Sequence, residues 1–169
     1  PAPTGAAALF PGRVVNDNDF LAQMVAAGAL NVMDCLGMHY NEGLTAPRTT
    51  GDDPRDQFYT RHLPSMINVY RGAIGGAKPI CVTELGYMSD EGYGPPPAGF
   101  EWATGRISVQ QQAAWLADAA AYLSQQGDVR LMIVWNIDFQ YYNTDPMAGY
   151  AIIRGDGSCP ACSALSGAR

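Results

Sequence analysis

Three short apolar segments of the chain each run into a polar or aromatic residue, and the fold has to accommodate all three. The segments and the residues that follow them are 31–38 with His39, 80–83 with Glu84, and 131–134 with Trp135. Apolar runs of this length that lack polar alternation are typical of strands covered on both faces. Such strands occur in parallel sheets, so the sequence predicts a parallel sheet with buried strands.

Helical patterns separate the three segments. We expect helices over about residues 16–28, 64–74 and 108–127, and a brief helix near 162–165. The third helix opens on a capping box, with Ser108 as N-cap and Gln111 three residues later. Residues 150–153 are expected to extend the sheet before a tight turn at 155–157. Alternating helices and strands predict β/α units, whose right-handed crossovers place the carboxyl ends of all strands at one edge.

The residues at the strand ends form the candidate site. His39, Glu84 and Trp135 then share the edge at which parallel sheets bind ligands. A carboxylate placed like Glu84 serves either catalysis or a structural cap or ion pair, and both interpretations stay open. The loop at 88–106 is too long for a plain connection. Its Trp102 either faces a ligand or packs against the body of the protein.

Composition limits the size of the fold and the class of partner. A chain of 169 residues with 47% hydrophobic content predicts one domain over residues 1–169. A net charge of -6 argues against nucleic acid as a partner, because that partner requires clustered Lys and Arg. No apolar run approaches the roughly 20 residues that cross a bilayer, so no membrane partner is predicted. A doubly wound α/β domain is the alternative fold, but no Gly-rich phosphate loop supports it, because Gly75-Gly76 ends a helix instead of following a strand. No cofactor is predicted.

The cysteines do not indicate a metal site. Cys35 and Cys81 lie in apolar runs, where a free cysteine behaves as a small core residue, and we expect both to be reduced. Cys159 and Cys162 form a lone CxxC pair without a second pair or a nearby His. That pair predicts a local disulfide or two free thiols instead of zinc.

Other residue types that often carry function have plainer interpretations here. The acidic residues Asp52, Asp53 and Asp56 lack the ligand spacing of a calcium loop and are expected to form a solvated face. His62 has no supporting motif, and we assign it no role. Trp115 lies within the predicted helix 108–127 and is expected to pack against a neighbour. No metal site is therefore predicted.

In order and spacing, the strand ends resemble strands six, seven and eight of the retaining (β/α)₈ glycoside hydrolases of clan A. That superfamily holds cellulase-like and β-xylosidase-like enzymes. The segments that carry the resemblance are 38–40, 82–87 and 134–136, and residues 2–5 look like the tail of strand five. The resemblance implies an α/β fold of the TIM-barrel type, of which this chain supplies about the C-terminal half.

The resemblance also implies roles for single residues. Glu84 matches the catalytic nucleophile, which attacks the sugar of a β-linked oligosaccharide or polysaccharide in a retaining double displacement. The implied substrate-binding residues, with Trp102 added from the long loop, are His39, Tyr40, Tyr87, Trp102, Trp135 and Asn136. Proteins of this kind are usually extracellular, so an extracellular or cell-envelope location is expected, although no signal-peptide pattern is visible.

One part of the family pattern is missing from the chain. In the family, the acid/base Glu follows an Asn at the end of strand four, and Asn41-Glu42 copies that pair at the wrong strand end. Loss of general acid catalysis costs a factor of about 10² to 10⁴ in rate. Either an N-terminal barrel half or a second copy of the chain completes the enzyme, or the chain is a non-catalytic carbohydrate-binding or interaction domain.

Overall fold

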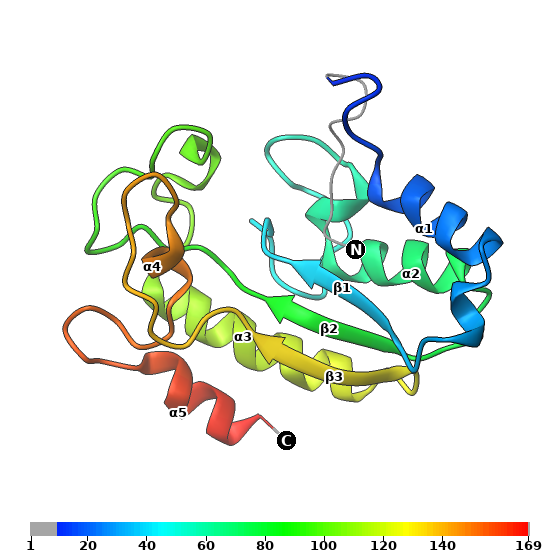
Figure 1. Cartoon of the computed structure of the whole chain (residues 1–169). Coiled ribbons are helices and arrows are strands. Elements are labelled where there is room, and N and C mark those ends of the chain that lie inside the picture. Colours follow the sequence, from blue (N-terminus) through cyan, green and yellow to red (C-terminus); the bar gives the residue numbers. More distant parts are fainter. Residues whose placement is uncertain (1–9, 169) are drawn as a thin grey trace.

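A three-stranded parallel sheet organises the protein, and the computed structural model describes residues 10–168 (Figure 1). The strands, in their order across the sheet, are β1 (Leu36–Tyr40), β2 (Ile80–Leu85) and β3 (Val129–Val134). Both strand pairs are parallel, as the apolar runs predict. Residues 2–5, which are expected to end a further strand, lie outside the described residues.

Helices connect and cover the strands. The α-helices are α1 (Asp17–Ala26), α2 (Leu63–Ala73), α3 (Val109–Ser124), α4 (Met147–Tyr150) and α5 (Pro160–Gly167). Short 3₁₀ turns are η1 (Ala29–Asn31), η2 (Tyr59–Arg61) and η3 (Glu101–Ala103). The predicted capping box begins α3. The Ser108 hydroxyl accepts from the Gln111 backbone N–H at 3.1 Å, and the Gln111 side chain accepts from the Ser108 N–H at 3.0 Å.

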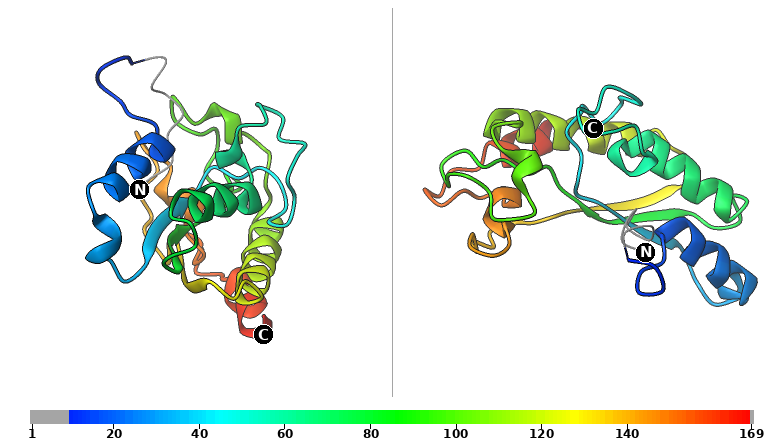
Figure 2. Two further views of the ribbon diagram at one scale, coloured as in Figure 1. Left: turned by 90° about the vertical axis from the view of Figure 1, so that its right-hand side faces the viewer. Right: turned by 90° about the horizontal axis from the view of Figure 1, so that it is seen from above.

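Helices α2 and α3 lie on the same face of the sheet, where the core forms (Figure 2). Apart from Cys81, the buried side chains of the strands are Leu36, Met38, Tyr40, Ile80, Val82 and Leu85. They join one apolar cluster with Ile67 of α2 and Leu116 of α3. Successive strand residues point to opposite faces, so Leu131 and Ile133 of β3 point away from this core and remain 39% and 51% exposed. The described residues therefore cover only one face of the sheet, not the two that were predicted.

Two predicted elements differ from those in the structure. Strand β1 begins at Leu36 instead of residue 31, because Gly28 turns the chain with a φ of 88° and η1 follows at once. Residues 151–153 form no strand, although the backbone N–H groups of Ile152 and Ile153 donate to the carbonyls at 136 and 137. The partner segment has already left β3 at that point, so these two bonds do not extend the sheet.

The structure corrects the prediction for Cys35 and Cys81, which form a disulfide with a Cα–Cα distance of 5.9 Å. Cys35 directly precedes β1, and the register of the sheet places its neighbour Leu36 opposite Ile80. The pairing arises from the contact of two strands that are far apart in sequence, for which the sequence carries no local signal. Cys159 and Cys162 form the local disulfide that the CxxC spacing allowed.

The acidic residues that were expected to form a solvated face differ in how far their side chains are buried. Asp53 is an exception to the prediction, because its side chain is fully buried and Arg55 binds it at 2.7 Å. Asp56 is largely exposed and pairs with Arg61 at 3.2 Å. Within residues 10–168, no three His, Cys, Asp or Glu side chains are arranged to hold a metal ion. None of the helices described there has the length and hydropathy needed to cross a bilayer.

Candidate functional site

Glu84 lies near the carboxyl end of β2, the middle strand, and two neighbours hold its carboxylate. The Asn41 amide donates to Oε2 at 2.8 Å, and His39 Nδ1 lies 3.3 Å from the same oxygen. The side chain of Glu84 is 25% exposed, so the carboxylate remains accessible. The structure thus brings His39 and Glu84 together. It adds Asn41, which in the sequence is notable only as the partner of Glu42 in a misplaced motif.

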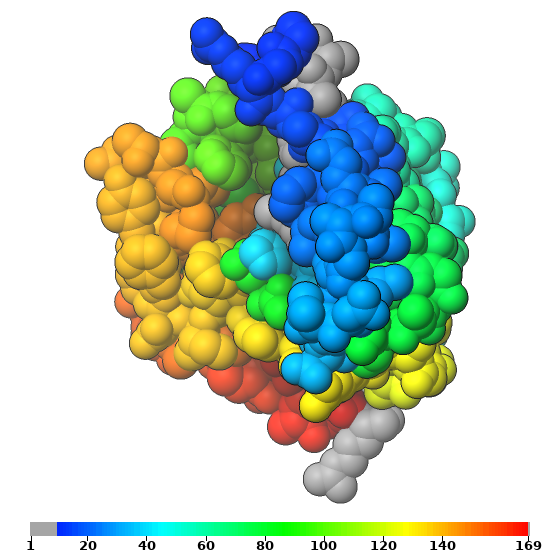
Figure 3. Space-filling view, turned by 45° about the vertical axis from the view of Figure 1, so that its right-hand side comes forward, coloured from blue at the N-terminus to red at the C-terminus, as the bar shows by residue number. Residues whose placement is uncertain are grey.

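A cleft of about 400 Å³ opens beside Glu84. Its lining combines carboxyl groups with aromatic rings and consists of Asn41, Glu42, Glu84, Gly99, Phe100, Trp102, Trp135, Asp145, Met147 and Tyr150. The space-filling view shows a hollow between the green segment near residue 100 and the orange segment near residue 147 (Figure 3). Aromatic walls beside hydrogen-bonding groups suit a sugar, which presents both C–H faces and hydroxyl groups.

Trp135 enters the cleft from the end of β3 and is placed by its backbone. Its N–H donates to the Leu85 carbonyl at 2.9 Å, which continues the pairing with β2 beyond the strand. A Cβ added at Gly86 would lie 2.4 Å from the Trp135 carbonyl oxygen and 2.8 Å from the Tyr150 ring. Only glycine therefore allows this close approach. The peptide bond between Trp135 and Asn136 is cis.

Trp102 belongs to η3 in the β2–α3 loop (residues 86–108), and Arg55 of the β1–α2 loop (residues 41–58) holds it. The Arg55 guanidinium lies 4.7 Å from the centre of the indole ring. The same guanidinium binds both carboxylate oxygens of Asp53 at 2.9 and 2.7 Å. Burial acts to raise the pKa of Asp53, but the hydrogen bonds and charge of Arg55 outweigh it and lower that pKa overall. The two long loops are therefore joined beside the cleft.

Three of the predicted substrate-binding residues support the cleft from behind. Tyr40 and Tyr87 are fully buried, and their rings meet edge to face at 5.9 Å. Burial raises the pKa of both phenols. Asn136 is buried, and its amide donates to the Met147 carbonyl at 2.8 Å. Neither Tyr40 nor Tyr87 is among the described residues that line the cleft. Trp115 packs against Tyr87 at 5.2 Å.

Two further carboxyl groups line the cleft beside Glu84. Glu42 forms an ion pair with Arg61. Asp145, which the sequence analysis did not identify, has its Oδ1 enclosed without a hydrogen-bond partner among the described residues. Both carboxyl groups affect the pKa of buried Tyr150. Burial raises the pKa of its phenol, and the charges of Glu42 and Asp145 raise it further. Among the described residues, the cleft lining therefore contains three carboxyl groups.

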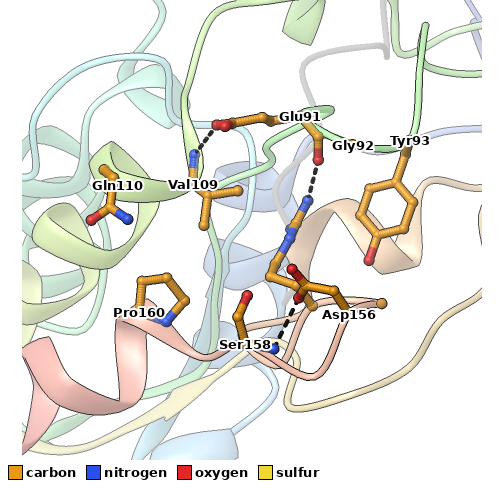
Figure 4. Close-up of a pocket in the computed structure, with 10 residues that line it drawn as sticks. Glu91, Gly92, Tyr93, Val109, Gln110, Asp156, Ser158 and Pro160 are labelled. Carbon is orange, nitrogen blue, oxygen red and sulfur yellow. Dashed lines mark hydrogen bonds between the residues drawn. The ribbon is translucent and has the colours of Figure 1, made fainter.

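A second cavity, of about 420 Å³, lies at the start of α3 (Figure 4). The Glu91 carboxylate accepts from the Val109 backbone N–H there at 2.7 Å. Buried Arg154 donates to the Glu91 carbonyl at 2.7 Å and stacks on the ring of Tyr93 at 4.6 Å. The polar groups of this cavity are thus bound to one another, and they tie the β2–α3 loop to the segment that precedes α5.

No protein-family model matches the sequence, and no curated protein does. Among solved structures, a family 39 glycoside hydrolase from the gut symbiont Bacteroides cellulosilyticus WH2 matches 89% of this chain at a TM-score of 0.56 and 16% identity. A GH128 (subgroup VII) oligosaccharide-binding protein from Trichoderma gamsii matches 84% at a TM-score of 0.44 and 15% identity.

The chain spans only 30% of the length of the family 39 hydrolase and 46% of the GH128 protein. At such low identity, the likeness to the hydrolase concerns the fold and not the chemistry. It agrees with the predicted fold at a coarse level. The chain is a mixed α/β unit with a small parallel sheet, similar in fold to part of a glycoside hydrolase.

Proposed function

We propose that this chain forms the nucleophile-bearing part of a retaining glycoside hydrolase that acts on β-linked glycans. One observation carries the proposal. The Glu84 carboxylate lies at the carboxyl edge of a parallel sheet, is held by Asn41 and His39, and faces a cleft with aromatic walls. In (β/α)₈ enzymes, this edge of the sheet is where the chemistry takes place. The fold similarity to part of a glycoside hydrolase supports a carbohydrate-related function, but not by itself the mechanism or the nucleophile.

In the proposed reaction, a Glu84 oxygen attacks the anomeric carbon and the glycosidic C–O bond breaks. The leaving oxygen takes a proton from a general acid, and water later releases the sugar from Glu84 with retention of configuration. The Asn41 amide and the His39 ring orient the attacking carboxylate. Trp135 offers its indole face to the C–H side of the reacting sugar.

The proposed reaction also needs a general acid. In retaining enzymes the two carboxyl groups lie roughly 5 Å apart. Glu42 is a poor candidate, because its carboxylate is engaged by Arg61. We propose that an N-terminal barrel half, or a second copy of the chain, supplies the acid. Either would also cover the open sheet face at Leu131 and Ile133.

A second candidate function is carbohydrate binding without hydrolysis. The engagement of Glu42 by Arg61 favours it, since this carboxyl group of the cleft lining is then not free to act as the acid. The two disulfides are typical of oxidising compartments. We therefore propose an extracellular or cell-envelope location for either function.

The nucleophile can be tested without the missing acid. A 2,4-dinitrophenyl 2-deoxy-2-fluoro-β-glycoside carries a leaving group that departs without protonation, so Glu84 alone should capture the sugar. We expect the glucoside or the xyloside to add one sugar mass to the chain, and peptide mass spectrometry should place it on Glu84. Glu84→Gln should abolish labelling.

Glu91→Gln is the matched control, because Glu91 lies in the separate cavity at the start of α3. This variant should label like the parent chain. A sugar attached at another residue, or no labelling by either reagent, would remove Glu84 as nucleophile. In the second case, oligosaccharide binding measured by calorimetry would leave the non-catalytic function as the conclusion.

A further inference from the structure

The charge of the cleft bears on which glycans enter it, if the proposed carbohydrate function holds. Among the described residues that line the cleft, three carry carboxyl groups and none is Lys, Arg or His. Two of the three carboxylates are partnered from outside the lining: Glu84 by His39 and Glu42 by Arg61. The basic side chains that partner them, His39 and Arg61, are therefore already engaged.

Asp145 is the exception. It follows Trp135 in the β3–α4 loop (residues 135–146), and it forms no ion pair within the described part of the chain. One carboxylate oxygen is enclosed without a hydrogen-bond partner there. An unpaired carboxylate beside aromatic walls is poorly compensated, because such walls cannot replace the hydrogen bonds of water.

A charged ligand changes this balance in a direction that depends on its sign. An acidic sugar adds a negative charge to a cleft that already holds three carboxyl groups, and nearby like charges repel strongly where water is displaced. A sugar ammonium instead supplies Asp145 with a charge-assisted hydrogen bond. A neutral sugar gains hydroxyl contacts without either effect.

We propose that the cleft prefers β-linked glycans that contain a free amino sugar over neutral glycans, and neutral glycans over acidic ones. Asp145 is the residue that distinguishes these glycans by their charge. This inference rests on the proposed function and names its substrate class. Glu84 remains the residue proposed to act on the anomeric carbon, and Asp145 acts on specificity alone.

Three tetrasaccharides with the same β-1,4 backbone test the proposal: the glucosamine tetramer, cellotetraose and the glucuronic acid tetramer. Calorimetry is done below the pKa of the sugar amine. We expect the glucosamine tetramer to bind about fivefold more tightly than cellotetraose, the value of one partly exposed ion pair. The acidic tetramer should bind more weakly than both, and added salt should reduce the differences.

Asp145→Asn keeps the shape of the side chain and should weaken binding of the glucosamine tetramer about fivefold, while cellotetraose changes less than about twofold. Asp138→Asn removes the same charge from the same loop outside the cleft lining and should leave all three affinities unchanged. Thermal unfolding of both variants shows whether they fold.

The outcomes separate this inference from the proposed function. Equal affinities for the three tetramers, or an equal loss for all three in Asp145→Asn, would overturn the charge preference and leave carbohydrate binding intact. Loss of the amine preference in Asp138→Asn as well would assign it to net charge instead of Asp145. Failure of all three tetramers to bind would overturn the proposed function, and the preference with it.

Discussion

Removing the disulfide between Cys35 and Cys81, in the variant Cys35→Ser/Cys81→Ser, should destabilise the fold strongly. The bond joins the start of β1 to β2 across a sequence separation of 46 residues. If the bond acts mainly by restricting the unfolded chain, a loop of this length contributes about 4 kcal/mol at 25 °C. That is a large share of the roughly 5 to 15 kcal/mol by which a typical domain is stable.

Urea unfolding, followed by circular dichroism, measures the effect. The double variant should lose about 4 kcal/mol relative to the oxidised parent. The parent treated with dithiothreitol, which reduces both disulfides, should lose more than the variant. Cys159→Ser/Cys162→Ser is the matched control. Its bond closes a separation of only 3 residues, for which the same relation gives about 2 kcal/mol.

Comparing the two variants tests whether the stabilisation depends on the length of the loop that each disulfide closes. The long-range bond should matter more than the local one by about 2 kcal/mol. If the variant lacking Cys35 and Cys81 loses no more than its control, the loop-length argument fails for this protein. Thiol titration of the unfolded parent should find no free cysteine, and any free thiol at Cys35 would contradict the pairing itself.

Further substitutions test the walls of the cleft. Arg55→Met should shift the fluorescence of Trp102 and increase its quenching by acrylamide, because the guanidinium no longer covers the ring. Arg48→Met, which removes another cation–π contact away from the cleft, should not, and equal spectra for both would contradict the contact. Gly86→Ala should cost about 1 to 3 kcal/mol in urea unfolding, since its methyl would meet a backbone oxygen at 2.4 Å. Gly72→Ala in α2 has open space and should instead stabilise by about 0.5 to 1 kcal/mol; a similar gain at both glycines would refute the packing argument.

The sequence predicts the framework well because its signals are local. The Ser108 capping box marks the start of α3 to the residue, and the apolar runs mark all three strands. Alternation along a strand also shows why one expectation went too far. His39 and Tyr40 are neighbours in β1 and point to opposite faces, so they cannot both face a ligand. Tyr40 enters the core with Met38.

Contacts between distant segments could not be predicted in the same way. Asn41 reaches Glu84 across 43 residues, and the Cys35–Cys81 bond spans 46. Asp145 lies ten residues beyond the Trp that marks its strand end, in a loop whose path depends on tertiary contacts. Strand ends therefore point to Glu84 and Trp135, which line the cleft, but not to the lining residues that the loops supply.

The contact of Arg55 with Trp102 also couples the motions of the β1–α2 and β2–α3 loops. Arg55 is fixed to buried Asp53 within its own loop, so the indole is attached to a point that cannot shift alone. Widening the cleft by swinging out the β2–α3 loop would either break the cation–π contact or pull the β1–α2 loop along. The two loops should therefore fluctuate together as one flap beside the cleft.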